Sequence, residues 1–250
     1  MVHKLAIVAI IGLTGSAVCM GAAAAIGGQQ FGKDFADGMD FSMFSDLPRC
    51  EAVQGATATS RDLDWDGSDH VGLAVPAHAV YAPGSDNKLH VTGAPQLLAH
   101  LRVHDGNIEI DCASTRRQRD KYRDAVLEIV LPGREFRKFS IAGSGSLLLQ
   151  NLNQTRLKVS IAGSGSIKAD GKVETTEIHI AGSGDADLGK VVSQVSEVHI
   201  AGSGNTDIAP TEEAEIHIAG SGDVNMHSNP KKLETHIAGS GRIHNVASGG

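Results

Sequence analysis

Apolar and polar residues alternate around one six-residue phrase that returns six times in the second half of the chain. The phrase is Ser- or His-Ile-Ala-Gly-Ser-Gly, and its copies begin at residues 140, 160, 179, 199, 217 and 236. Aliphatic residues stand two apart on both sides of each copy, as in Val198 and Ile200 before the fourth Gly-Ser-Gly and Ile208 after it. A period of two is typical of strands that bury one face. One such unit every 18 to 20 residues is typical of one coil of a β-solenoid.

This pattern predicts an all-β fold, a single-stranded parallel β-helix of about 19 residues per coil with an N-terminal β cap. The crossover rule for parallel strands favours a right-handed coil. Each Gly-Ser-Gly corner bends the chain where side chains must be tiny and φ can be positive. The glycines expected to act as structural turns are Gly143, Gly145, Gly163, Gly165, Gly182, Gly184, Gly202, Gly204, Gly220, Gly222, Gly239 and Gly241.

The rest of the chain divides into three further segments. Residues 65–132 carry shorter alternating stretches and are expected to form N-terminal strands or first coils ahead of the repeat solenoid at 133–250. Within them, His104-Asp-Gly-Asn107 has the composition of a tight hairpin turn. Residues 29–64 have little periodicity and are expected to be a linker.

The N-terminal segment indicates export from the cytoplasm. Residues 5–26 carry no charge, and small residues at 22–25 offer cleavage sites, so residues 1–28 are read as a signal peptide, or alternatively as an uncleaved membrane anchor. The periplasm or cell surface of a bacterium is then the expected location. In an oxidising compartment, Cys50 and Cys112 are expected to form a disulfide.

Composition excludes several classes of function. The formal net charge of -7 argues against non-specific nucleic-acid binding, which needs a basic face. No Phe, Tyr or Trp follows Phe139, so the solenoid has no aromatic platform for sugar rings, and a polysaccharide-active enzyme remains only a distant alternative. The Gly-Ser-Gly copies lack the Gly-x-Ser-x-Gly spacing of a nucleophile elbow, and no catalytic residue is predicted.

The outer face of the coils carries candidate metal ligands. Four coils share Glu-x-His-Ile, and stacking would turn these residues into parallel Glu and His ladders. Imidazoles on adjacent strands are candidate zinc ligands, and acidic residues after the corners are candidate calcium ligands. Both sets are equally consistent with an ordinary solvated β face, so no cofactor is predicted. The candidates are His179, His199, His217, His236, Asp185, Asp187, Asp207 and Asp223.

The segments Leu101–Ile110 and Leu127–Pro132, followed by serial Ile-Ala-Gly-Ser-Gly coils, resemble the family called putative auto-transporter adhesin, head GIN domain, over roughly residues 65–246. The resemblance implies a β-helix of the bacterial cell envelope. The sequence thus favours an exported, non-enzymatic structural or adhesive surface module that contacts an envelope polymer or a protein surface. A metal-binding solenoid is the alternative, and end-to-end self-association is a further hypothesis.

Overall fold

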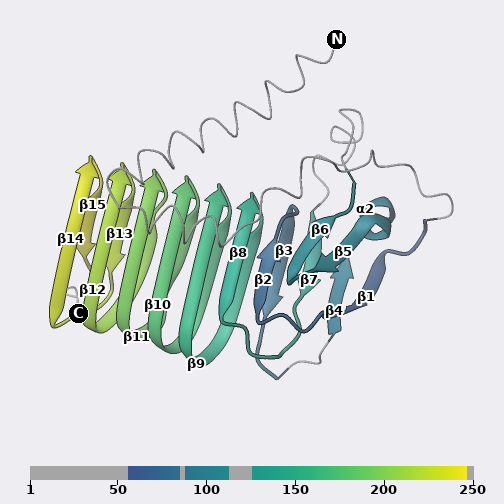
Figure 1. Cartoon of the computed structure of the whole chain (residues 1–250), viewed down its shortest axis with the longest axis horizontal. Helices are drawn as coiled ribbons and strands as arrows, with labels where there is room; N and C mark the ends of the chain where they lie inside the picture. Colours follow the sequence, from purple (N-terminus) through teal and green to yellow (C-terminus); the bar gives the residue numbers. More distant parts are fainter. Residues whose placement is uncertain (1–55, 85–87, 113–125, 247–250) are drawn as a thin grey trace, which may run out of the picture.

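The repeat winds as a β-solenoid in which like residues stack on like. A computed structural model describes residues 56–84, 88–112 and 126–246, and Figure 1 shows the coils side by side along the long axis. Strands of successive coils pair in parallel, so that Ile161 lies beside Ile180 and Ile180 beside Ile200. The predicted fold class, a parallel β-helix with a period of about 19 residues, is confirmed. The expected signal peptide or anchor at 1–28 lies outside the described residues.

The solenoid strands run from Lys138 to Asn245. They are β8 (Lys138–Gly143), β9 (Ser146–Gly163), β10 (Ser166–Gly182), β11 (Asp185–Gly202), β12 (Thr206–Gly220), β13 (Asp223–Met226), β14 (Lys232–Gly239) and β15 (Arg242–Asn245). The long strands β9 to β12 bend within one coil and supply both of its faces (Figure 1). The two halves of the last coils are instead separate strands, because β12 pairs with both β13 and β14.

The core is a set of aliphatic columns inside the coils. The residue before each Ala-Gly is an isoleucine, and Ile141, Ile161, Ile180, Ile200 and Ile218 are all buried. β-Branched side chains suit this position because they are stiff at χ1 and pack well on a pleated surface. Each fully buried isoleucine contributes about 1.5–3 kcal/mol of hydrophobic stabilisation.

The corners need glycine for two separate reasons. The first glycine of each corner has a positive φ, for example +125° at Gly182 and +133° at Gly202, which side-chain-bearing residues rarely adopt. The second glycine lies directly over the coil beneath it. A Cβ on Gly204 would lie 2.2 Å from the carbonyl oxygen of Gly184 and 2.6 Å from Cγ2 of Ile180. The close stacking of coils therefore excludes even a methyl group at this position.

A mixed β region covers the N-terminal end of the solenoid. Its elements are β1 (Ser60–Asp64), β2 (His70–Leu73), β3 (Ala77–Tyr81), β4 (Lys88–Thr92), α2 (Pro95–His100), β5 (Leu101–His104), β6 (Asn107–Ile110) and β7 (Leu127–Val130). Strands β2 and β3 continue the parallel stack onto β8 and β9. Strand β7 pairs in parallel with β3, and β4 pairs antiparallel with both β7 and β1. The hairpin expected at His104–Asn107 joins β5 to β6, with positive φ at Asp105 and Gly106.

Two features of this region differ from the sequence expectation. Strand β1 lies within residues 29–64, for which the sequence predicts a linker. Its polar sequence carries no strand pattern, because pairing with β4 orders this strand rather than burial of an apolar face. The single-turn helix α2 begins at Pro95 and buries only Leu98, so it has no periodicity that the sequence could reveal. No helix among residues 56–84, 88–112 and 126–246 is long and apolar enough to cross a membrane.

Aromatic side chains fill the core where this region meets the first coil. Phe136 lies at the centre of the cluster, with ring centroids 5.2 Å from Trp65, 5.7 Å from Tyr81 and 5.9 Å from Phe139. Edge-to-face pairs of this kind contribute about 0.5–1.5 kcal/mol each beyond area burial.

Candidate functional site

The Glu-x-His residues form a continuous double ladder on one outer face of the solenoid. Strands β10, β11, β12 and β14 align them so that each Glu and each His lies beside its counterpart in the next coil. We call these eight residues the Glu–His ladder. They are Glu177, His179, Glu197, His199, Glu215, His217, Glu234 and His236.

The imidazole rings of the ladder are stacked face to face. Ring centroids of successive histidines are 5.0, 4.9 and 4.8 Å apart, with interplanar angles of 13° to 22°. Each ring also contacts the carboxylate two residues earlier on its own strand. The Nε2–Oε1 distances are 2.6 Å in β10 and β11, 2.7 Å in β12 and 3.1 Å in β14. The repeating chemical unit is therefore a Glu–His dyad rather than two independent columns.

The histidine column is less exposed than the sequence predicts. Side-chain exposure rises along the ladder from 2% at His179 through 12% and 24% to 56% at His236. Stacking covers both faces of the interior rings, and the glutamates cover one edge, whereas the last ring has an open face. A partner approaching this side meets the carboxylates of β10 and β11 first and reaches imidazole only near β14.

Electrostatic interactions fix the charge of the carboxylates. The hydrogen bond from His179, helped by one of 2.6 Å from Lys158 Nζ, outweighs burial and lowers the pKa of Glu177 to about 2. The hydrogen bond from His199 likewise lowers the pKa of Glu197. At neutral pH both groups are therefore carboxylates, and the ladder is an ordered array of acceptors.

The ladder does not bring the candidate zinc ligands into a chelating arrangement. Two Zn–N bonds of about 2.1 Å span at most about 4.2 Å between nitrogens. Successive parallel rings are 4.8 to 5.0 Å apart, so equivalent nitrogens of neighbouring histidines are too far apart to share an ion without rotation of the rings. His179, His199, His217 and His236 are brought together, but as a stack rather than a tetrahedral set.

The candidate calcium ligands take part in links between coils. Asp185 Oδ1 accepts a hydrogen bond from the backbone N–H of Asn205 at 3.0 Å, and Asp223 Oδ1 accepts one from Arg242 at 2.9 Å. Asp187 pairs with Lys168 at 2.5 Å, and Asp207 lies 2.7 Å from His227 Nε2. These interactions give the four aspartates a structural role, because each joins its own coil to a neighbouring one.

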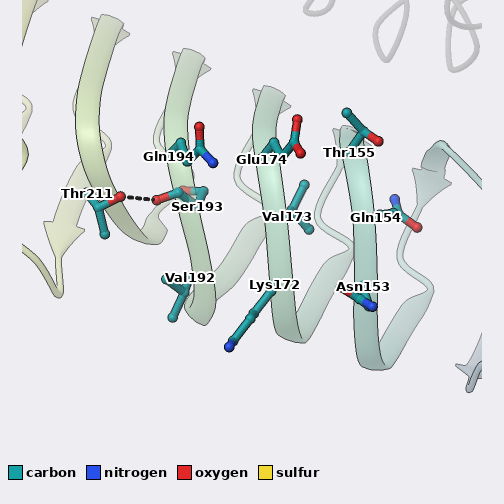
Figure 2. A pocket seen from close by; sticks show the side chains of 10 residues that line it. All are labelled: Asn153, Gln154, Thr155, Lys172, Val173, Glu174, Val192, Ser193, Gln194 and Thr211. Carbon is teal, nitrogen blue, oxygen red and sulfur yellow. Dashed lines mark hydrogen bonds between the residues drawn. The ribbon is translucent and has the colours of Figure 1, made fainter.

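A polar groove of about 390 Å³ crosses four coils at the bend between the two faces (Figure 2). Equivalent positions of successive strands line it, since Lys172 pairs in register with both Asn153 and Val192. We call it the coil groove. Its lining residues are Asn153, Gln154, Thr155, Lys172, Val173, Glu174, Val192, Ser193, Gln194 and Thr211.

Hydrogen bonds hold the floor of the coil groove in place. Thr211 Oγ1 donates to the backbone carbonyl of Ser193 at 2.9 Å, which joins β12 to β11 (Figure 2). Behind it, the hydroxyl of Ser193 lies 2.9 Å from that of Ser196, which lies 2.7 Å from Thr176. All three hydroxyl groups belong to buried residues, so the chain of hydrogen bonds satisfies them. The sequence does not predict the groove, because register shifts between neighbouring strands on this side of the coil interrupt the regular spacing of equivalent residues.

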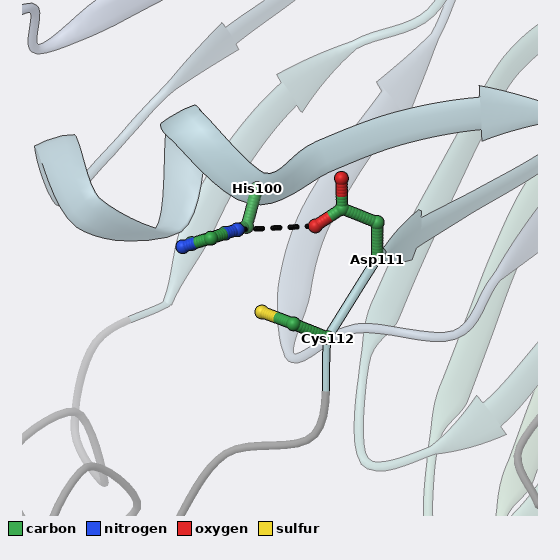
Figure 3. A group of neighbouring side chains, drawn as sticks. All are labelled: His100, Asp111 and Cys112. Atoms are coloured by element: carbon green, nitrogen blue, oxygen red, sulfur yellow. Dashed lines mark hydrogen bonds and ion pairs between the residues drawn. The ribbon is translucent and has the colours of Figure 1, made fainter. Parts of the chain in front are cut away.

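A second cluster lies in the N-terminal region, where His100, Asp111 and Cys112 approach one another (Figure 3). His100 Nδ1 is 3.1 Å from Asp111 Oδ1, and Arg102 pairs with the same carboxylate at 2.9 Å. Cys112 is the predicted partner of Cys50, which lies outside the described residues, so the disulfide stays a prediction. That disulfide would occupy the sulfur, and the ion pairs already engage the carboxylate.

Comparisons with known proteins identify relatives of the solenoid. Residues 124–230 match the family model described as putative auto-transporter adhesin, head GIN domain. A crystal structure of a putative adhesin from Bacteroides fragilis is 17% identical, with a TM-score of 0.55, and the match covers 75% of this chain and 96% of that chain. A putative lipid binding protein from Parabacteroides distasonis is 16% identical, with a TM-score of 0.45 and the same coverage. The Bacteroides protein shares the fold. No curated protein matches the chain.

Proposed function

Because residues 124–230 match the family model described as putative auto-transporter adhesin, head GIN domain, we propose that the chain is an exported, non-enzymatic adhesive module of the bacterial cell envelope. Its partner in this proposal is an extended envelope polymer that lies along the solenoid. The signal-peptide pattern of residues 1–28 supports export.

The observation that carries the proposal is the regular repetition of the same polar groups. The Glu–His ladder presents one dyad every 4.8 to 5.0 Å along the solenoid axis. A polymer also repeats its groups at regular intervals, so several weak contacts can form together. Linked contacts raise the overall affinity by orders of magnitude without any strong individual contact.

The coil groove offers a path for such a polymer. It extends across four coils, and its lining combines amide, hydroxyl, carboxylate and ammonium groups. These groups hydrogen-bond to a hydroxyl-rich chain such as a polysaccharide, and no described residue after Phe139 supplies an aromatic ring other than imidazole for stacking. Binding would therefore rely on many hydrogen bonds and would be shallow and multivalent.

A binding assay with groove variants tests this function. Immobilised envelope polysaccharide and envelope protein fractions are each incubated with the protein, with and without EDTA. We expect retention on polysaccharide that persists in EDTA and falls about tenfold in a Lys172→Ala/Gln194→Ala variant. Glu128→Ala, an exposed position on β7, is the control and should bind normally.

Three results would contradict the proposal. Retention that requires Zn²⁺ or Ca²⁺ would favour the metal-binding alternative. Release of reducing or unsaturated ends from the polysaccharide would identify an enzyme. Retention on the protein fraction alone would leave a protein surface as the partner instead of a polymer.

A further inference from the structure

The last coil leaves its apolar side chains uncovered. Leu233 and Ile237 of β14 are 46% and 44% exposed, whereas Ala214 and Ile218, their neighbours in β12, are almost completely buried. Among the described residues, β14 pairs with β12 alone and β15 with β13 alone. The outer edge of β14 therefore combines unpaired backbone groups with an open end of the apolar core, which is a template for further strand pairing.

Among the described residues, the opposite end of the solenoid presents no open coil of the same kind. The β5–β6 hairpin, α2 and strands β1, β4 and β7 lie over the first coils (Figure 1), and Leu98 and Leu101 are buried there. Head-to-tail stacking would place an open coil against this covered end. Two C-terminal ends are instead identical, and identical surfaces pair through a twofold axis.

The sequence of β14 is self-complementary in one antiparallel register. With the axis at Thr235, residues whose numbers sum to 470 lie opposite each other, so Leu233 faces Ile237 of the second copy on the inner side. On the outer side, Glu234 faces His236 of the second copy. Moving the axis by one residue places Glu234 against itself or His236 against itself, so like groups would meet. Charge complementarity and apolar matching thus select the same register.

We propose that two copies of this chain associate end to end through their last coils, with β14 of each copy paired antiparallel across a twofold axis at Thr235. The pairing supplies hydrogen-bond partners for both strand edges and covers Leu233 and Ile237 of both copies. It also joins the two Glu–His ladders into one continuous array on a single sheet. This inference does not depend on the proposed polymer binding.

Disulfide trapping tests the register in cells that express the whole chain. Thr235→Cys is expected to form a crosslinked dimer that migrates at twice the mass of the monomer on a non-reducing gel, because the two substituted positions face each other across the axis. Glu234→Cys and His236→Cys should not crosslink, since each faces a different residue. The unmodified chain on the same gel controls for its natural cysteines. Crosslinking at position 234 or 236 but not at 235 would overturn the register.

Sedimentation of the purified protein over a range of concentrations tests the association itself. The unmodified protein is expected to sediment as a dimer, and Ile237→Lys should raise the dimer dissociation constant at least about tenfold, because it buries a charge twice across the axis. Val130→Lys is the matched control, since Val130 is 47% exposed but lies on β7, far from β14. Circular dichroism shows whether each variant keeps its β structure. A monomer at every concentration, or a dimer unaffected by Ile237→Lys, would overturn the proposal.

Discussion

A comparison of two corner glycines separates the cost of backbone conformation from the cost of coil stacking. Gly143 and Gly202 occupy equivalent corners and both have positive φ, +107° and +133°. A Cβ on Gly143 would meet nothing within 4 Å. A Cβ on Gly202 would lie 2.2 Å from the carbonyl oxygen of Gly182.

These distances predict different losses of stability. Gly143→Ala should cost only the conformational strain of a positive φ, about 1–2 kcal/mol. Gly202→Ala adds an overlap that two coils can relieve only by moving apart, which costs about 1–3 kcal/mol more. We therefore expect free-energy losses of about 1–2 kcal/mol for Gly143→Ala and about 2–5 kcal/mol for Gly202→Ala.

Urea unfolding monitored by circular dichroism measures both losses, provided that each variant keeps the m-value of the unmodified protein, which is the slope of the unfolding free energy against urea concentration. Native-state hydrogen exchange gives a second readout, because the damage in Gly202→Ala should spread to the amides of β10 and β11. Equal losses in the two variants would refute the reasoning, since strain at the corner would then account for the whole requirement for glycine.

Three further predictions follow from the ladder and the core. The lowered pKa of Glu177 contributes up to about 3 kcal/mol of stability above pH 4.5, and this contribution is lost as the pH falls towards 2. The stability gap between the unmodified protein and Glu177→Gln, measured by urea unfolding at several pH values, should therefore close over that range. Ser196→Ala should cost about 1–3 kcal/mol in urea unfolding because it breaks a buried hydrogen-bond chain, and adding Ser193→Ala should recover part of that loss because it removes a hydroxyl group that has lost its partner. Zn²⁺ should leave the melting temperature unchanged because the imidazoles are too far apart to chelate, and a rise that disappears in histidine-to-alanine variants would contradict this.

The sequence was sufficient to predict the regular part of the fold, because its repeat carries the same information six times. Alternation around Ile180 or Ile200 identifies the buried face, and equal spacing identifies the register of the coils. The N-terminal elements were only partly predictable. The hairpin turn at Asp105 has a local signal in its positive-φ residues. Strand β1 instead depends on β4, whose central residue is 28 positions away in the chain, since Asp62 pairs with His90.

The candidate site was predictable as a set of residues but not as a geometry. Period-two spacing indicates that Glu177 and His179 share a face, but it does not show that they contact each other or that the rings stack. Those features depend on side-chain rotamers and on the burial of the ladder. The coil groove was missed because it forms where bulges shift the register near Lys168 and Asp187, and residues such as Gln194 have no repeated counterpart there.

In-register stacking also determines how the molecule would respond to mechanical load. Each coil is bonded only to the coils beside it, so tension on the C-terminal end would detach β14 from β12 one backbone bond at a time. A force that pulls two whole coils apart along the solenoid axis must instead break all the hydrogen bonds between them at once. An attachment near β15 would therefore fail at low force, because the strands peel away one bond at a time. An attachment to the covered N-terminal end would resist a higher force, because the bonds between two coils share the load.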